Sequence, residues 1–259
     1  MSARKPRSSG RLAVAVLALL GAGCAIALPP PRQAVPEDAR HAIGLLVARW
    51  HAFEDLRALA DIVIERDAER QAFTGVLLAR APASVRFEAL TPLGQPVLLA
   101  TIHDGRFTAY NAATNEATAG EATPETTARL LGLPLEGDDL VATLAGRAVP
   151  PRDLRLAEIQ PADELGSSVL LVGAVHEKRV WMDLQTGVVR QVRIAGGRVA
   201  ATVSFRRDDG GQLAGFDLAA AERQVTGTVA YRRLEMDVGV PVDRFLLTVP
   251  KDAKIQQIR

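Results

Sequence analysis

The chain has 259 residues, of which 48% are hydrophobic, 4% aromatic and 24% charged. This length and apolar content are enough for a sizeable buried core, so the composition excludes a chain that is disordered throughout. The single cysteine excludes an internal disulfide framework and a multi-cysteine metal site. The net charge of +1 provides no global attraction to nucleic acid, which is therefore not an expected partner.

The first 23 residues have the three-part pattern of a secretory signal, with four basic residues and no acid, then an apolar run over 12–20, then small residues. The apolar stretch over 12–28 is marginal for the roughly 20 residues that span a bilayer. We therefore predict removal after export, with a retained anchor as the alternative. Removal would leave 27 basic and 30 acidic residues, a net charge of −3.

Gly21, Ala22 and Gly23 directly before Cys24 resemble the lipobox of bacterial lipoproteins, although Gly21 stands where a large aliphatic residue is usual. The resemblance implies a diacylglycerol on the Cys24 thiol, and a chance cysteine beside an ordinary cleavage site is the alternative. Ala25 follows in place of aspartate, which implies the periplasmic face of the outer membrane in bacteria that sort by this position. Residues 24–36 contain four prolines and predict an extended tether.

The folded part begins with an amphipathic helix predicted over 37–60, whose apolar residues recur at spacings of three and four. From Asp61 the period becomes two, and Pro, Gly and Asp-Gly signals separate the short apolar segments. This pattern predicts an antiparallel meander with strands at 61–66, 72–80, 84–91, 96–102 and 106–111.

Two short helices are predicted next, over 124–132 and 138–146, because each begins after a capping signal and ends at a glycine. Strands follow at about 153–160, 168–176, 178–185, 188–195, 198–206, 213–220, 224–233 and 243–249. The sequence therefore predicts one α+β domain over 37–259 with a single curved antiparallel sheet. A sheet this long must coil or close, and helices can then fill its concave side.

Common catalytic signatures are missing from the sequence, including the Gly-x-Ser-x-Gly elbow, the Walker loop and His-Glu-x-x-His. The four histidines, at 41, 51, 103 and 176, lack the spacing typical of metal ligands, so we expect no metal and no cofactor. His176-Glu177-Lys178 is predicted to be a solvated hairpin tip. An exported hydrolase using Glu121, Asp138 or Asp139 stays as a minor hypothesis against the expectation that the chain is not an enzyme.

Several strands carry apolar runs in place of clean alternation, as at 76–79 (VLLA), 97–100 (VLLA) and 169–172 (VLLV). Because few side chains are aromatic, the concave surface could be underfilled and hold a dry cavity suited to acyl chains. The alternative is an ordinary core filled by the helices.

Residues 85–95 (VRFEALTPLGQ) resemble a stretch of the LolA/LolB lipoprotein-localisation family, most closely the LolB type, in which a strand ends in a Pro-Leu-Gly turn. The likeness continues through 123–125 (TPE), 129–135 (RLLGLPL) and 139–146. With the first helix it covers about residues 37–150. The strands of the second half, and the ending over 242–250, are more loosely similar to the broader LolA type.

The resemblance implies an unclosed antiparallel β-barrel with helices as a lid over an apolar cavity. It also implies a LolB-like receptor that takes the acyl chains of lipoproteins from a periplasmic LolA-like carrier and delivers them to the outer membrane, as a monomer. The alternative is a lipid-anchored binding or sensing module of the same fold that holds another amphiphile. Leu93, between Pro92 and Gly94, matches the protruding leucine that helps push lipid into the membrane, and a leucine folded back over the sheet edge is the alternative.

Overall fold

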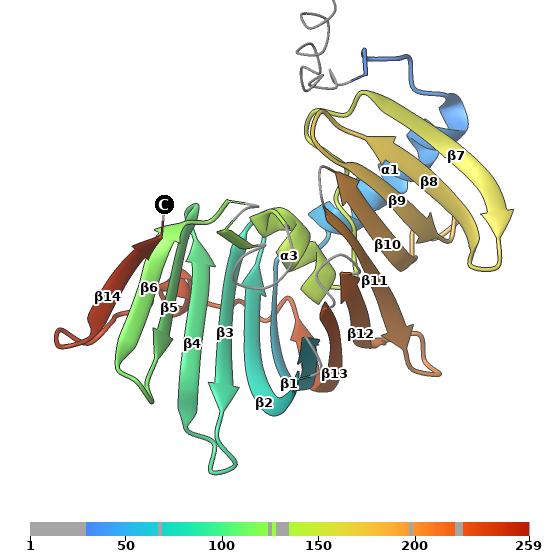
Figure 1. Cartoon of the computed structure of the whole chain (residues 1–259). Helices are drawn as coiled ribbons and strands as arrows, with labels where there is room; N and C mark the ends of the chain where they lie inside the picture. Colours follow the sequence, from blue (N-terminus) through green and yellow to red (C-terminus); the bar gives the residue numbers. More distant parts are fainter. Residues whose placement is uncertain are drawn as a thin grey trace, which may run out of the picture.

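The computed structural model describes residues 30–66, 69–123, 126–127, 135–196, 199–220 and 225–258. In these residues, fourteen strands form one sheet in the order β14-β6-β5-β4-β3-β2-β1-β13-β12-β11-β10-β9-β8-β7 (Figure 1). The strands are β1 (Asp55–Arg66), β2 (Glu69–Arg80), β3 (Ser84–Leu90), β4 (Pro96–His103), β5 (Arg106–Asn111), β6 (Glu116–Glu121), β7 (Leu156–Asp163), β8 (Gly166–Val172), β9 (Glu177–Met182), β10 (Val189–Gly196), β11 (Val199–Arg207), β12 (Leu213–Ala220), β13 (Val225–Met236) and β14 (Lys254–Ile258).

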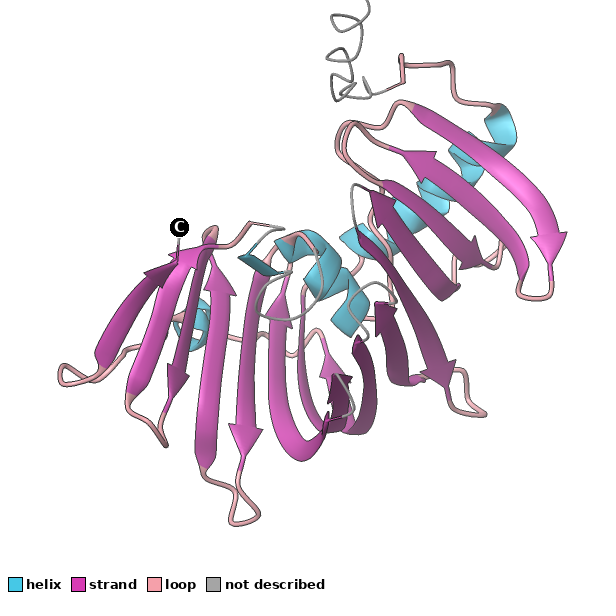
Figure 2. Ribbon diagram, viewed as in Figure 1, coloured by secondary structure: helices cyan, strands magenta, loops and turns pink. Residues whose placement is uncertain are grey.

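The sheet is curved and remains open between β14 and β7, which confirms the predicted α+β class with an unclosed barrel (Figure 2). Neighbouring strands are antiparallel, except that β14 pairs with β6 in parallel. Helices α1 (Glu37–His51) and α3 (Gly137–Leu144) lie on the sheet, α1 across β7 to β10 and α3 near its middle (Figure 1). Of the helix predicted over 124–132, only Thr126 and Thr127 are within the described residues.

Helix α1 ends nine residues earlier than the sequence pattern predicts, because His51 is its last residue and β1 already begins at Asp55. The buried Asp55 carboxylate accepts hydrogen bonds from the backbone amides of Val238 and Val240, both at 3.0 Å, and this binds the chain to the end of β13. Phe53 and Leu56 are buried as their spacing suggests, but from a loop and a strand. Apolar spacing alone therefore cannot locate this helix end.

The concave face of the sheet is apolar because the strand register brings apolar side chains together in rows. One row runs across five strands through Phe73, Ile62, Val229, Phe216 and Phe205, each paired with the next. Directly paired residues share a face, and successive residues alternate between faces. The convex face consequently receives the intervening polar residues.

Ion pairs lie on the convex face. Asp61 pairs with Arg232 at 2.7 Å, and Arg206 pairs with Asp217 at 3.1 Å. Hydrogen bonding to Arg232 lowers the pKa of Asp61, so this carboxylate stays ionised. The convex face around these ion pairs is thus solvated, while the concave face faces the helices.

The C-terminal segment crosses the convex face and differs from the prediction. The strand predicted over 243–249 is absent, and a 3-10 helix η2 (Val242–Phe245) lies there instead, with Phe245 buried against Leu78 and Val240. Strands β6 and β14 were not predicted, because Glu116–Glu121 and Lys254–Ile258 contain mostly small or polar residues. These two strands form through backbone pairing and lack the alternating apolar residues from which a strand is predicted.

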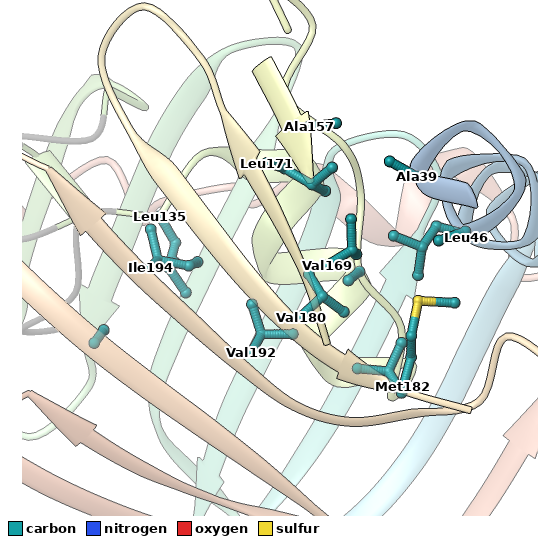
Figure 3. Close-up of a cluster of buried hydrophobic side chains, with 14 of the residues drawn as sticks. Ala39, Leu46, Leu135, Ala157, Val169, Leu171, Val180, Met182, Val192 and Ile194 are labelled. Carbon is teal, nitrogen blue, oxygen red and sulfur yellow. The ribbon is translucent and has the colours of Figure 1, made fainter. Parts of the chain in front are cut away.

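Helix α1 fills one half of the concave face. Ala39, Ala42 and Leu46 are buried in a cluster with residues of β7 to β10, and Figure 3 shows Ala39 and Leu46 projecting from α1 toward Val169 and Met182. Two alanines on the contact face let the helix approach the strands closely. This half of the sheet therefore has the ordinary helix-filled core that the sequence left open as an alternative.

Candidate functional site

The other half of the concave face holds an apolar cavity of about 210 Å³ beneath α3. Among the described residues, no charged side chain lines it, and its polar side chains are threonines. Its lining residues are Ile62, Val63, Ile64, Leu77, Val85, Phe87, Ala100, Thr101, Ile102, Phe107, Leu135, Leu140, Thr143, Leu144, Phe216, Leu218, Val225, Thr226, Gly227, Thr228 and Val229. A cavity of this composition favours an apolar ligand and disfavours water.

The sequence forms the floor of the cavity through strand alternation and one close approach. Gly75 of β2 faces the concave side, where a Cβ atom would lie 2.9 Å from both Ile62 Cδ1 and Phe87 Cε2. Only glycine lets these two lining side chains meet over the strand without displacement. The rings of Phe73 and Phe87 are then 5.8 Å apart, centroid to centroid.

Helix α3 forms the roof, with Leu140, Thr143 and Leu144 toward the cavity. Its C-terminal end is tied to the sheet, because the Tyr231 hydroxyl donates a hydrogen bond to the Leu144 carbonyl at 2.7 Å. Burial raises the pKa of Tyr231 far above its ordinary value, so the phenol stays a neutral donor. At the N-terminal end, Gly137 packs against Ala83, where a Cβ atom would lie 2.8 Å from the alanine Cβ.

A buried ion pair holds the first turn of α3 to the far half of the sheet. Lys178 Nζ of β9 donates to Asp139 Oδ1 at 2.6 Å and to the Val149 carbonyl at 3.1 Å. The exposed fractions of the two side chains are 9% and 12%. Burial raises the pKa of Asp139, and the positive charge of Lys178 opposes that shift. The prediction that His176-Glu177-Lys178 is a solvated tip is thus wrong for Lys178, which lies on the concave face.

The most exposed part of the cavity lining lies at the rim that also carries the β3–β4 turn. Antiparallel neighbours alternate in direction, so β1 and β3 end at the same rim of the sheet. Ile64, near the end of β1, lines the cavity and is 36% exposed. The most exposed part of the lining and the β3–β4 turn therefore share one rim.

Leu93 lies at the tip of the β3–β4 turn with 88% of its surface exposed, so it is not folded back over the sheet edge. The turn is closed by the Thr91 amide bonded to the Gln95 carbonyl and by the Gly94 amide bonded to the Thr91 carbonyl, both at 2.8 Å. Gly94 has φ +80°, a left-handed conformation that glycine adopts without strain. The flanking Pro92 is likewise exposed, and neither residue contributes to the core.

The remaining candidate residues are not brought together into one site. Cys24 lies outside the described residues. Glu121 is exposed at the end of β6, whereas Asp139 bonds Lys178 and Asp138 bonds Arg152 at 3.2 Å. Within the described ranges, no group of three or more His, Cys, Asp or Glu side chains could hold a metal ion. The helices of the described residues are all too short or too polar to cross a membrane.

No protein-family model and no curated protein matches the sequence. Solved structures do match the fold, and three of them have a TM-score of 0.56. A domain from Vibrio parahaemolyticus, assigned to outer membrane lipoprotein sorting, is 10% identical, and the match covers 80% of this chain and 97% of that one. A DUF1329 family protein from Desulfovibrio piger is 11% identical, with 82% and 98% covered.

A LolA superfamily protein from Nitrosomonas europaea is 9% identical, with 81% of this chain and 97% of that chain covered. Identities this low establish a shared fold and nothing more. The chain therefore has a LolA-like fold, an unclosed barrel with an apolar cavity.

Proposed function

We propose that this protein binds the acyl chains of lipids or lipoproteins in the cavity beneath α3. The observation that supports the proposal most is the apolar lining, since no charged side chain of the described residues faces the space. Each methylene group that leaves water contributes about 0.8 kcal/mol, so even a single chain gains substantial binding energy in such a site. The LolA-like fold supports the same class of ligand.

The more specific proposal is a LolB-like receptor, anchored by a lipid on Cys24 at the periplasmic face of the outer membrane. In this role the protein accepts acyl chains from a soluble carrier and delivers them to the bilayer. The Pro-Leu-Gly turn supports it, because this turn shares a rim with the most exposed part of the cavity lining and exposes Leu93. The lipobox-like residues before Cys24 and the following Ala25 support the location.

A second candidate is a lipid-anchored module of the same fold that holds or senses another amphiphile. It is favoured by the half of the sheet over β7 to β10, which α1 fills and which the LolB-type resemblance does not cover. Mixing the purified protein with a fluorescently acylated lipoprotein, its carrier and vesicles separates the two. Acceptance followed by delivery supports the receptor, whereas acceptance without delivery supports the module. Failure to accept any acyl chain would contradict both.

Replacing Leu93 by glutamate is expected to impair transfer into vesicles without affecting acyl binding or stability. An exposed substitution of this kind usually changes the free energy of unfolding by less than about 0.5 kcal/mol, whereas a carboxylate at the turn cannot enter the apolar part of a bilayer. Transfer is measured by co-flotation of the labelled lipoprotein with vesicles. Leu165→Glu is the matched control, because Leu165 is 43% exposed at the β7–β8 turn. Transfer by the Leu93 variant at the wild-type rate would remove Leu93 from the mechanism.

A further inference from the structure

Thr143 of α3 brings one hydroxyl group to the roof of the apolar cavity. It lies on the same face of the helix as Leu140 and Leu144, since residues three and four apart are neighbours on a helix surface. Only 9% of its surface is exposed. The Thr143 hydroxyl makes no hydrogen bond with the described residues, whereas the hydroxyl of Thr127 donates to the carbonyl of Thr123, four residues earlier, at 3.2 Å.

The strand threonines of the lining direct their side chains to the other face of the sheet. Thr226 and Thr228 alternate with the concave-face residues of β13, and the Thr228 hydroxyl accordingly donates to Asp217 of the convex face at 2.9 Å. Thr101 directly follows Ala100, which is on the concave face, so it too belongs to the convex set. Among the described lining residues, the hydroxyl that faces the cavity is therefore that of Thr143.

This hydroxyl needs a partner that the ligand can supply. A buried hydroxyl group without a hydrogen bond destabilises the fold. Water is a poor partner here, because a buried water molecule requires two to four polar neighbours and the side chains that face this cavity are otherwise apolar. An oxygen atom carried into the cavity by the ligand would complete the bond.

The charges around Thr143 decide which oxygen group fits. No charged side chain of the described residues lines the cavity, so a carboxylate placed there would lose its hydration without meeting a cation. Thr143 is also in the last turn of α3, which ends at Leu144, and the C-terminal end of a helix repels anions. The carbonyl of an ester is uncharged and accepts a hydrogen bond from a hydroxyl group, so it suits this position.

We propose that Thr143 donates a hydrogen bond to the carbonyl oxygen of an acyl ester held in the cavity. The site then prefers uncharged acyl esters to the anions of free fatty acids. Such an anion inserts only its hydrocarbon part and keeps its carboxylate in water, out of reach of Thr143. This inference rests on the proposed acyl-binding function and adds the chemical class of the ligand.

Thr143→Val tests the proposal, because valine has nearly the shape of threonine but lacks the hydroxyl group. Thr143→Ser is the matched control, since it keeps the hydroxyl. The affinity of each purified full chain for a fluorescent fatty acid is determined first. Methyl decanoate and decanoate, which is ionised at neutral pH, are then titrated as competitors of that probe. Thermal unfolding of each ligand-free protein is measured in parallel.

We expect Thr143→Val to weaken binding of methyl decanoate about tenfold, the effect of one lost hydrogen bond to a buried carbonyl. Its binding of decanoate should stay at the wild-type level, and Thr143→Ser should resemble the wild type with both competitors. Ligand-free Thr143→Val should unfold at or above the wild-type temperature, because no hydrogen bond within the fold is lost.

Two outcomes would overturn the role of Thr143 alone. One is an unchanged affinity of Thr143→Val for methyl decanoate. The other is an equal loss of affinity for both competitors together with a lower unfolding temperature, which would assign the hydroxyl to the fold. If the wild type bound neither the probe nor the competitors, the acyl-binding function would be rejected, and this inference with it.

Discussion

Replacing Lys178 by methionine is expected to lower the free energy of unfolding by about 3–5 kcal/mol, the usual cost of leaving one partner of a buried pair uncompensated. The variant leaves the Asp139 carboxylate buried and removes the Lys178 ammonium group, whose Nζ lies 2.6 Å from Asp139 Oδ1. It also frees the first turn of α3 from β9. Urea denaturation followed by circular dichroism measures the change.

The double variant Lys178→Met with Asp139→Leu is expected to recover most of the lost stability, because replacing a buried pair by apolar residues is often neutral or better. Lys251→Met is the surface control, since Lys251 lies exposed in a turn, and it should change stability by less than about 0.5 kcal/mol. A loss below about 1 kcal/mol in the single variant would show that the pair does not hold α3 in solution.

The stability deficit of Lys178→Met, meaning its loss in free energy of unfolding relative to the wild type, should also depend on pH. Burial raises the folded-state pKa of Asp139 above the ordinary value of 3.8. A raised folded-state pKa means that the fold favours the protonated carboxyl. The stability that this protonated carboxyl contributes is present at low pH and is lost as pH rises through the raised value. Without Lys178 the carboxyl takes up a proton more readily, so the deficit should be largest at neutral pH and shrink toward pH 4. A deficit that grows on acidification would contradict this sign.

Replacing Ala100 by phenylalanine is expected to weaken binding of a long-chain fatty acid strongly. Ala100 of β4 lines the cavity and pairs with Phe87 on the concave face. A phenyl ring there takes the place of roughly three methylene groups at about 0.8 kcal/mol each, which corresponds to a ~50-fold loss of affinity. Titration of a fluorescent fatty acid into the purified protein measures the loss.

Ala219→Phe is the matched control for the cavity variant. Leu218 of β12 lines the cavity, and the next residue, Ala219, is exposed on the opposite face of the same strand. The control should bind the fatty acid as the wild type does. Both variants should also denature as the wild type does, apart from the usual small change in stability that one added ring causes. Unchanged affinity in Ala100→Phe would place the ligand outside this cavity.

Much of the fold follows from sequence, because strands with one apolar face carry a pattern of period two. Strands β1 to β5 and β7 to β13 agree with the predicted strands to within four residues, except that β1 begins at Asp55, six residues before its predicted start. The end of α1 and the two strands β6 and β14 could not be predicted locally. Long-range contacts determine all three, through the Asp55 carboxylate in the first case and backbone pairing in the others.

The candidate site was predictable only in part. Apolar strands with few aromatics indicated an underfilled concave face, but which half would be empty depends on where α1 packs. The sequence did not predict the buried position of Lys178, because a lysine next to a turn is normally solvated. Its burial is stable only because Asp139 of α3 pairs with it. The sequence signal that could have indicated this ion pair was the two consecutive aspartates at the start of a helix, together with one lysine in a strand.

A photoreactive palmitic acid, cross-linked to the purified protein and mapped by mass spectrometry, directly locates the site at which the protein binds acyl chains. We expect saturable labelling of cavity residues such as Leu77, Phe87, Leu144 and Phe216, which unlabelled palmitate competes away and which Ala100→Phe strongly reduces. Labelling that cannot be saturated, or that falls on the convex face with the cavity residues unmodified, would contradict this expectation.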